Sequence, residues 1–275
     1  MLQEDKIIAL YCIVDDLLKG IGHHERGNRK MSDSEIITTA LVSALYFGGN
    51  QDNGRGFMQM TGLVTGMLDK SGFCRRLHGL EALICSLFFQ IGHHLKSIAG
   101  ASEYIMDSFP VAVCHNMRIS RARLLQGSQW RGYTASMRQY FYGVKVQVLT
   151  TATGIPVEFC FMPGREHDIT ALGQLPLAVA PECRIYADNG YMNQQTEETI
   201  WEAEQIKLMV QRRANNKIQD APWIRFLKQY MRKPIETTFS GIKNLFPKKI
   251  HAVTAKGFLL KIVVFIVAFT LNKLT

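Results

Sequence analysis

The spacing of apolar residues changes once along the chain, near residue 100, and this change limits the folds that the sequence can adopt. Before it, apolar residues recur every three to four positions, as over residues 4–21, which is the period of an amphipathic helix. After it, the stretch FYGVKVQVLTT alternates, with Val144, Val146 and Val148 on one face, as in a strand. The sequence therefore predicts a helical segment followed by a segment that contains a sheet.

The first hundred residues are predicted to be helical throughout. The tetrad S-D-S-E at Ser32 is a capping box ahead of the apolar run IITTALVSALYF. The Gly-rich stretch GGNQDNGRG is predicted to be a break, and helices are predicted over residues 57–69 and 73–98. We expect a small helical domain over residues 1–100.

Strands and helices are predicted to mix over residues 101–275. The strands are YIMDSF, the hairpin FYGVKVQVLTT with PVEFCFM, CRIYADNGY and KLMVQRR. The helices are DITALGQL with Asp168 at its N-cap, QTEETIWEAEQ, and IETTFSGIKNLF starting near Pro234. We therefore expect an α/β fold with helices flanking the sheet.

Positive charge is concentrated in one part of the chain. From Lys207 to Lys261 there are thirteen Lys and Arg but only two acids, Asp220 and Glu236, so this segment carries +11 while the whole chain carries +9. Clustered Lys and Arg favour a polyanionic partner, because binding releases counterions from a phosphate backbone. A solvated basic face is the alternative interpretation.

The cysteines and the two chain ends suggest a cytoplasmic protein. The six cysteines form no C-x-x-C pair and no zinc-like spacing, so we expect reduced, mostly buried thiols. The first residues lack the order of a signal peptide. The apolar run IVVFIVAFTL has ten residues, too few for a membrane span of about 20. We expect it to be a buried core helix and expect no membrane partner.

Two carboxylates lie where burial makes them costly. Asp107 is inside the apolar stretch YIMDSFPVAV, and Asp188 ends the apolar run CRIYAD. A buried carboxylate has to be hydrogen-bonded or bound to a metal. Each could be an ordinary satisfied strand-end acid, but two on strands that could be neighbours favour a shared role.

Glu236 is a third candidate, since it is the lone acid of the last predicted helix. Ile235, Phe239, Ile242 and Phe246 would form the apolar stripe of that helix, with Glu236 and Lys243 beside it. Arg232 precedes Glu236 by four residues, so an ordinary i,i+4 ion pair is the alternative. Three carboxylates in a basic groove suit two Mg²⁺ ions and phosphoryl transfer on DNA.

In these residues the chain resembles the DDE (Asp, Asp, Glu) transposases of bacterial insertion sequences, which have a ribonuclease H-like fold shared with retroviral integrases. The resemblance covers roughly residues 101–272 and rests on MDSFPV, RISRAR, YGVKVQVLTTATGIPVEF, PGREHD, YADNGY and HAVTAKGF in order. Arg232, Glu236 and Lys243 match the Arg-x3-Glu-x6-Lys signature of one branch. The chain departs from that branch at Tyr230, one position late, and at Gln147, where many relatives have His.

The resemblance implies a mixed five-stranded sheet with flanking helices. It implies that Asp107, Asp188 and Glu236 bind two Mg²⁺ ions, for which Mn²⁺ would substitute, and catalyse cleavage of an element's ends and their joining to target DNA. The partners would be double-stranded DNA, both terminal inverted repeats and target, and a second copy when two ends are synapsed. The expected location is the bacterial cytoplasm, at the nucleoid when DNA is bound. The expected DNA contacts are Arg232, Lys243, Arg118, Arg121, Lys145, Arg212, Arg213, Lys248 and Lys249.

Several interpretations stay open. By domain order, residues 1–100 would recognise the inverted repeats, with Arg75 and Arg76 contacting phosphates or lying on a solvated helix face. Trp130 and Trp223 could stack on an unpaired base, although core packing is favoured for both. The chain could also be a nuclease of the same fold that does not join strands, or a silent DNA-binding descendant of a transposase.

Overall fold

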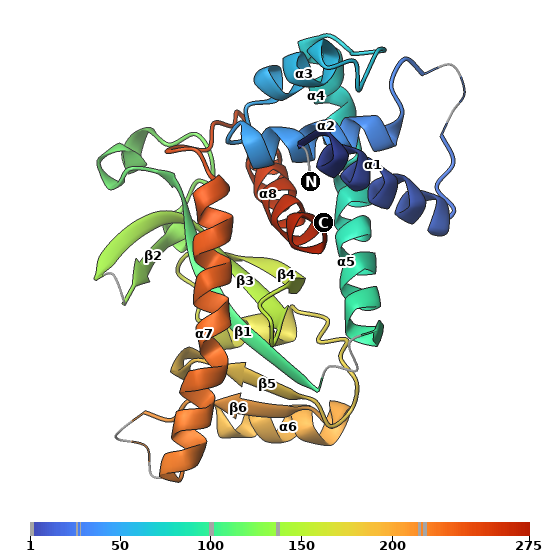
Figure 1. Ribbon diagram of the computed structural model, residues 1–275. Helices are drawn as coiled ribbons and strands as arrows, with labels where there is room; N and C mark the ends of the chain where they lie inside the picture. Colours follow the sequence, from blue (N-terminus) through green and yellow to red (C-terminus); the bar gives the residue numbers. More distant parts are fainter. Residues whose placement is uncertain are drawn as a thin grey trace. The chain divides into compact units, whose positions relative to one another are not determined.

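A computed structural model describes residues 3–25, 27, 29–98, 102–135, 138–213, 216 and 219–275 (Figure 1). The α-helices are α1 Gln3–Gly20, α2 Asp33–Tyr46, α3 Gln51–Met60, α4 Lys70–Gly79, α5 Glu81–Ile98, α6 Gln194–Glu204, α7 Pro222–Leu245 and α8 Ala255–Leu274. The strands are β1 Glu103–Cys114, β2 Arg131–Thr134, β3 Gln139–Thr151, β4 Pro156–Pro163, β5 Arg184–Ala187 and β6 Lys207–Val210. Short 3₁₀ turns are η1 Asn116–Arg121, η2 Ser128–Trp130, η3 Asp168–Gly173 and η4 Asn189–Tyr191.

Two compact units divide the chain. One contains residues 1–90 and 241–275, and the other contains residues 91–240. Both α5 and α7 have residues in each unit. The functional division predicted from the sequence, with recognition over residues 1–100 and catalysis over residues 101–275, stays a prediction.

The helical start of the chain is confirmed, and its Gly-rich segment is corrected. Ser32 caps α2 through the predicted capping box with Glu35. The stretch GGNQDNGRG is mostly helix, because the Asn50 side chain caps α3 by accepting from two backbone N–H groups. Gly54 lies where a Cβ would approach Ser43 of α2 to within van der Waals overlap, so this glycine permits close helix packing. The predicted helix over 57–69 is wrong, since α3 ends at Met60.

The predicted helix over 73–98 is two helices, α4 and α5, separated at Leu80. The closing helix α8 is the core of the first unit, and its Phe265 ring packs 4.9 Å from Phe246, centroid to centroid. With 20 residues, α8 is longer than its ten-residue apolar run suggested. By length and composition it is the one helix of the described residues that could cross a membrane, but 72% of its apolar window is buried inside the protein.

The second unit is built on a mixed sheet in the order β4-β3-β1-β5-β6, with β2 pairing the first residues of β3 on the β4 side. β1 is antiparallel to β3 and parallel to β5, and β5 is parallel to β6. This is the ribonuclease H-like arrangement expected from the sequence, five strands wide. The sequence did not predict β2, which has four residues and little apolar alternation.

Helices cover the two faces of this sheet differently. On one face, Tyr104 and Met106 pack in a core that includes Leu172 of η3 and partly buried Ile200 of α6. On the other face α7 runs across the strands (Figure 1), and Phe239 packs 4.8 Å from Phe109 of β1, centroid to centroid. Alternate residues of β1 therefore face α7 and the η3 side.

Helix α7 begins at Pro222, twelve residues before the predicted start at Pro234. Pro234 lies inside the helix, where its missing N–H leaves the turn one hydrogen bond short. The Thr238 hydroxyl donates to the carbonyl oxygens of Pro234 and Gly154, which ties this part of the helix to the β3–β4 turn. The buried stripe of Ile235, Phe239 and Ile242 is confirmed.

The cysteine prediction is only partly right. All six cysteines are free thiols, but only Cys183 is buried; Cys12 is exposed and the others are half-buried. Burial raises the pKa of the Cys160 thiol to about 11, so this thiol stays protonated near neutral pH.

Candidate active site

Asp107 and Asp188 lie side by side at one edge of the parallel pair β1–β5. Met106 pairs with Ala187 in the register, and the two acids are the next residues on the two chains. Parallel strands present their following residues at the same edge, so the predicted neighbourhood of the two acids is confirmed. Asp107 faces α7 with its side chain 22% exposed, and Asp188, just past its strand, is 40% exposed.

Arg232 of α7 bridges the two aspartates. One of its terminal nitrogens donates to Asp107 Oδ2 at 3.0 Å, and the other donates to Asp188 Oδ1 at 3.1 Å. The second nitrogen also donates to the side-chain oxygen of Gln211, just after β6, at 3.0 Å. One guanidinium therefore joins α7 to β1 and to the residues that follow β5 and β6, and the simple Arg232–Glu236 ion pair considered from the sequence does not form.

The carboxyl of Asp107 is hard to ionise here. Burial raises the pKa of Asp107, and the negative charge of Asp188 raises it further. The Arg232 guanidinium and the Ser108 backbone N–H lower the same pKa but do not offset burial. The single positive charge of Arg232 therefore does not offset the burial of Asp107 and the negative charge of Asp188.

Glu236 stands apart from the two aspartates. It follows Arg232 by one helical turn on α7, is exposed, and makes no hydrogen bond or ion pair with the described residues. Within the described part of the chain, the one group of three or more His, Cys, Asp and Glu ligand atoms within 4.8 Å is His23, Glu25 and Asp33. Of the three predicted acids, the structure therefore brings Asp107 and Asp188 together, whereas Glu236 lies one helical turn after Arg232, which bridges them.

A buried polar network lies on the opposite face of β1 from the Asp107 side chain. Asp168 Oδ1 accepts from Ser108 Oγ at 3.0 Å, Gln147 Nε2 at 2.9 Å and Lys145 Nζ at 3.3 Å. The Tyr191 hydroxyl donates to Gln147 Oε1, and burial raises the pKa of Tyr191, which keeps that hydroxyl protonated. The network joins the residues that follow Asp107 and Asp188 to β3.

The predicted N-cap role of Asp168 is wrong. His167 is the N-cap of η3 and makes no side-chain cap hydrogen bond, while the Asp168 carboxylate points into the network. Sequence analysis predicts no functional role for Gln147, Tyr191 or Gln211. The available signal was an amide side chain within the predicted strand FYGVKVQVLTT; Gln147 is fully buried in the structure, and a buried amide requires hydrogen-bond partners.

The nine predicted DNA contacts differ in exposure and in their partners. Three of them are held within the protein, namely Arg232 by the aspartates, Lys145 by Asp168 and the Glu166 carbonyl, and Arg212 by Glu197 at 2.8 Å. Lys243 is half-buried in the last turns of α7. The exposed group is Arg118, Arg121, Arg213, Lys248 and Lys249.

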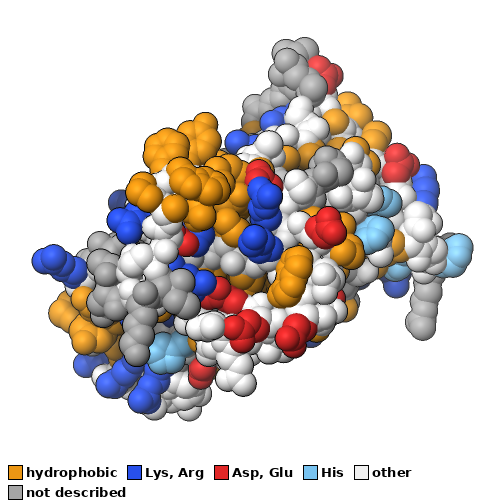
Figure 2. Space-filling model, turned by 90° about the horizontal axis from the view of Figure 1, so that it is seen from below, with side chains coloured by type: hydrophobic (Ala, Val, Ile, Leu, Met, Phe, Trp, Pro, Cys, Tyr) orange, Lys and Arg blue, Asp and Glu red, His pale blue; other side chains and the backbone are white. Residues whose placement is uncertain are grey.

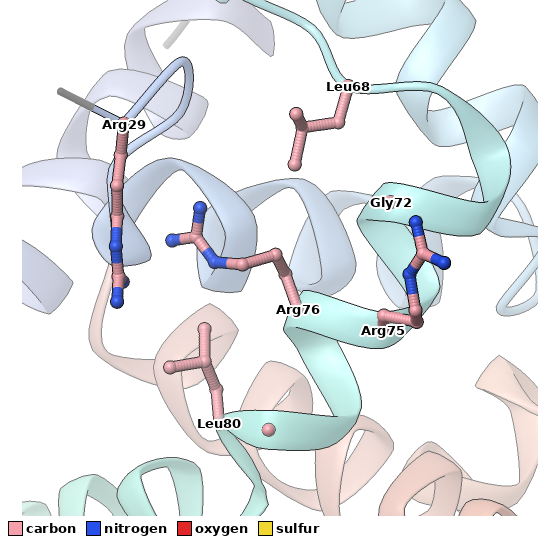
Figure 3. Close-up of a pocket in the computed structure, with 7 residues that line it drawn as sticks. Arg29, Leu68, Gly72, Arg75, Arg76 and Leu80 are labelled. Atoms are coloured by element: carbon pink, nitrogen blue, oxygen red, sulfur yellow. The ribbon is translucent and has the colours of Figure 1, made fainter.

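Another basic cluster lies in the helical unit, around a pocket of about 420 Å³ (Figure 3). Arg29 donates to both oxygens of Asp33 at 3.0 Å, and Arg76 donates to Asp33 and to the Met31 carbonyl. Arg76 is therefore structural, whereas Arg75 is exposed on α4. His23 Nε2 also lies 2.9 Å from Asp33 Oδ2, and because two arginines already bind the Asp33 carboxylate, the group of His23, Glu25 and Asp33 is a poor metal site.

The favoured core packing of Trp223 is wrong. Its side chain at the start of α7 is 69% exposed, and Phe226 and Tyr230 are 68% and 56% exposed. Trp130 is half-buried, and its indole N–H donates to the Gln126 carbonyl at 3.1 Å. The wrong prediction followed from starting the helix at Pro234, which left Trp223 outside any element.

Comparison with known proteins agrees with this geometry. The family described as Transposase DDE domain matches residues 99–252, more than half of the chain, and the matched segment contains both aspartates, Arg232 and Glu236. Neither the curated proteins nor the solved structures gave a match. With the sheet order and the paired acids, the match shows that this chain belongs to the family of transposase DDE domains.

Proposed function

We propose that the chain is the transposase of a bacterial insertion sequence, which cleaves the element's ends and joins their 3′ hydroxyls to target DNA. Family membership assigns a transposase-type polynucleotidyl transfer and DNA as the partner. The observation that carries the finer proposal is the pair of acids bridged by Arg232, because adjacent carboxylates on neighbouring strands that need a cation suit a divalent metal.

Transposase DDE domains use divalent metals, and the residues present fit such a group. Asp107 and Asp188 offer hard oxygen ligands, and the guanidinium between them marks a place where positive charge is stabilised. We propose that the two acids and Glu236 hold two Mg²⁺ ions, with Mn²⁺ able to substitute. Bound there, the ions would polarise the scissile phosphate and activate the attacking oxygen.

The chain's own residues have distinct parts in this proposal. Asp107 and Asp188 would position the reacting phosphate by supplying carboxylate oxygens to the metal ions. Glu236 would complete this group of metal ligands by turning its exposed side chain toward the two aspartates. Arg232 leaves the aspartates and binds a phosphate oxygen of the DNA, as Lys243 does further along α7. The exposed Arg118, Arg121, Arg213, Lys248 and Lys249 hold the backbone without reading its sequence.

The test is cleavage of duplex DNA that carries the flanks of the gene, with Mg²⁺, by the wild type and by Glu236→Gln. We expect nicks at the boundary of an inverted repeat and joined products with the wild type, and neither with the variant. Glu202→Gln, an exposed acid on α6, is the matched control and should behave as the wild type. Nicks without joining would favour the nuclease alternative, and binding without cutting would favour the silent descendant; either would overturn the proposal.

A further inference from the structure

The exposed aromatic residues of α7 form one row. Trp223, Phe226 and Tyr230 are spaced by three and four residues, which places them within about 60° on a helix with 3.6 residues per turn. The Phe226 and Tyr230 rings stack at 6.1 Å with an interplanar angle of 20°. We call these three residues the aromatic row; it points away from the buried stripe of α7.

Positive charge accompanies the aromatic row. From Pro222 to Ile235 the helix contains four Lys or Arg and no Asp or Glu. Two of these are used internally, since Lys228 pairs with Asp220 at 2.7 Å and Arg232 with the aspartates. Lys233 lies 5.5 Å from the centre of the Tyr230 ring, and Arg225 is exposed. Figure 2, which shows the molecule from below, has hydrophobic side chains gathered beside Lys and Arg.

The row is close to the active site along the helix. Tyr230 precedes Arg232 by two residues, a rise of about 3 Å. Around the helix, Lys233 lies between Tyr230 and Glu236 at about 100° per residue. A chain that leaves the acids can therefore pass over Lys233 and reach the aromatic rings without leaving α7.

The combination of rings and cations identifies the occupant. Exposed aromatic side chains with interleaved Lys and Arg are the pattern that binds unpaired nucleotides, because bases stack on the rings and phosphates meet the cations. A second copy of the chain fits less well, since a two-fold contact would set Lys233 and Arg225 against like charges. Base-paired DNA offers no exposed base faces to stack on the row.

We propose that the aromatic row of α7 is a stacking platform for unpaired bases of a DNA strand, with Lys233 holding the adjoining phosphate. The inference rests on the proposed function only for the source of the strand, which is the DNA end that cleavage leaves beside the acids. Binding itself needs neither metal nor catalysis. Its failure can therefore be told apart from failure of the proposed function.

The experiment is anisotropy of a labelled single strand of about 12 nucleotides, with EDTA present, compared with the same sequence as a blunt duplex. We expect Trp223→Leu to weaken single-strand binding about tenfold and duplex binding hardly at all, since Leu lacks a ring face. Trp223→Phe should retain most of the affinity. Lys233→Gln should weaken binding and reduce its salt dependence by about 0.7 in logarithmic slope.

Trp201→Leu is the matched control, because Trp201 is 44% exposed on α6 but has the acids Glu198 and Glu202 as neighbours. It should bind both DNA forms as the wild type does. Equal affinity of Trp223→Leu and the wild type for the single strand would overturn the proposal. So would equal weakening for single strand and duplex, or a change of sedimentation mass showing that the row joins two copies.

Discussion

Two clusters of this chain bind carboxylates to arginine, and they do so in opposite proportions. In the helical unit, Asp33 is 1% exposed and is bound by two guanidinium groups, those of Arg29 and Arg76, and by the imidazole of His23. At the site formed by β1 and the residue after β5, one guanidinium binds both Asp107 and Asp188. The first cluster therefore has two guanidinium groups for one aspartate, and the second has one guanidinium group for two aspartates.

The difference appears in the pKa values. Burial raises the pKa of Asp33, but the bonds from Arg76 and His23 outweigh it, so the net pKa is lowered. For Asp107 burial is the larger effect, and the net pKa is raised. A carboxylate whose charge is offset by its arginine partners stabilises the fold, whereas two acids that share one arginine form a site where a further cation can bind. The comparison separates a structural cluster from a candidate catalytic one without reference to the family.

The largest expected effect is the loss of the Asp33 cluster. Asp33→Ala leaves Arg29 and Arg76 without their shared acceptor, and we expect a loss of about 2–3 kcal/mol in the free energy of unfolding. Asp107→Asn should change it by less than about 1 kcal/mol, because its ionised form is already disfavoured. Urea denaturation checks both. Similar losses for the two variants would contradict the distinction.

A second prediction concerns the network beneath the acids. Asp168→Ala leaves the buried amide of Gln147 without an acceptor, and we expect a loss of about 1–3 kcal/mol in unfolding free energy. Glu166→Gln is the matched control, since only the backbone carbonyl of Glu166 contacts Lys145. If both variants unfold at the wild-type urea concentration, the network does not support β1.

A third prediction sharpens the charge argument. Arg232→Gln removes the cation that occupies the aspartates, so DNA-free protein should bind Mn²⁺ about tenfold more tightly, a change of about 1.4 kcal/mol. Lys233→Gln removes the same charge one residue later, from a side chain that faces Tyr230, and should change the affinity little. Calorimetric titration measures both. Weaker binding by Arg232→Gln would show that Arg232 supports the metal ligands rather than competing with the ion.

The smallest expected effect is on how the free energy of unfolding depends on pH. Because the folded pKa of Asp107 is raised above its ordinary value of 3.8, the folded state binds more protons there than the unfolded state. Asp107 therefore favours folding as the pH falls through its raised pKa toward 3.8. Asp33, with a lowered pKa, loses its stabilising contribution as the pH falls below 3.8. The stability difference between wild type and Asp107→Asn should thus grow in favour of the wild type on acidification, and a flat difference would contradict it.

The sequence predicted the parts of the fold that depend on local pattern. The alternation in β3, the capping box at Ser32 and the acids in β1 and just after β5 could be predicted because each depends on neighbouring residues in the chain. The start of α7 was predicted wrongly because proline is common at the first position of a helix, and Pro234 was taken as that position. In the structure the helix continues through Pro234, where the Thr238 hydroxyl bonds to the Gly154 carbonyl and the buried stripe packs on the sheet. Arg232 binds two aspartates that are each more than 40 positions away in the chain, so no local sequence pattern predicts this contact.

We propose that Asp107, Asp188 and Glu236 share divalent metal ions, although Glu236 makes no hydrogen bond or ion pair with the described residues. The most direct test is calorimetric titration of Mn²⁺ into the wild type, Asp188→Asn and Glu236→Gln, each bound to DNA with the element's cleaved end. We predict that both variants lose at least about tenfold in affinity relative to the wild type. Titration of Glu236→Gln that matches the wild type, beside a weakened Asp188→Asn, would remove Glu236 from the site and contradict the account.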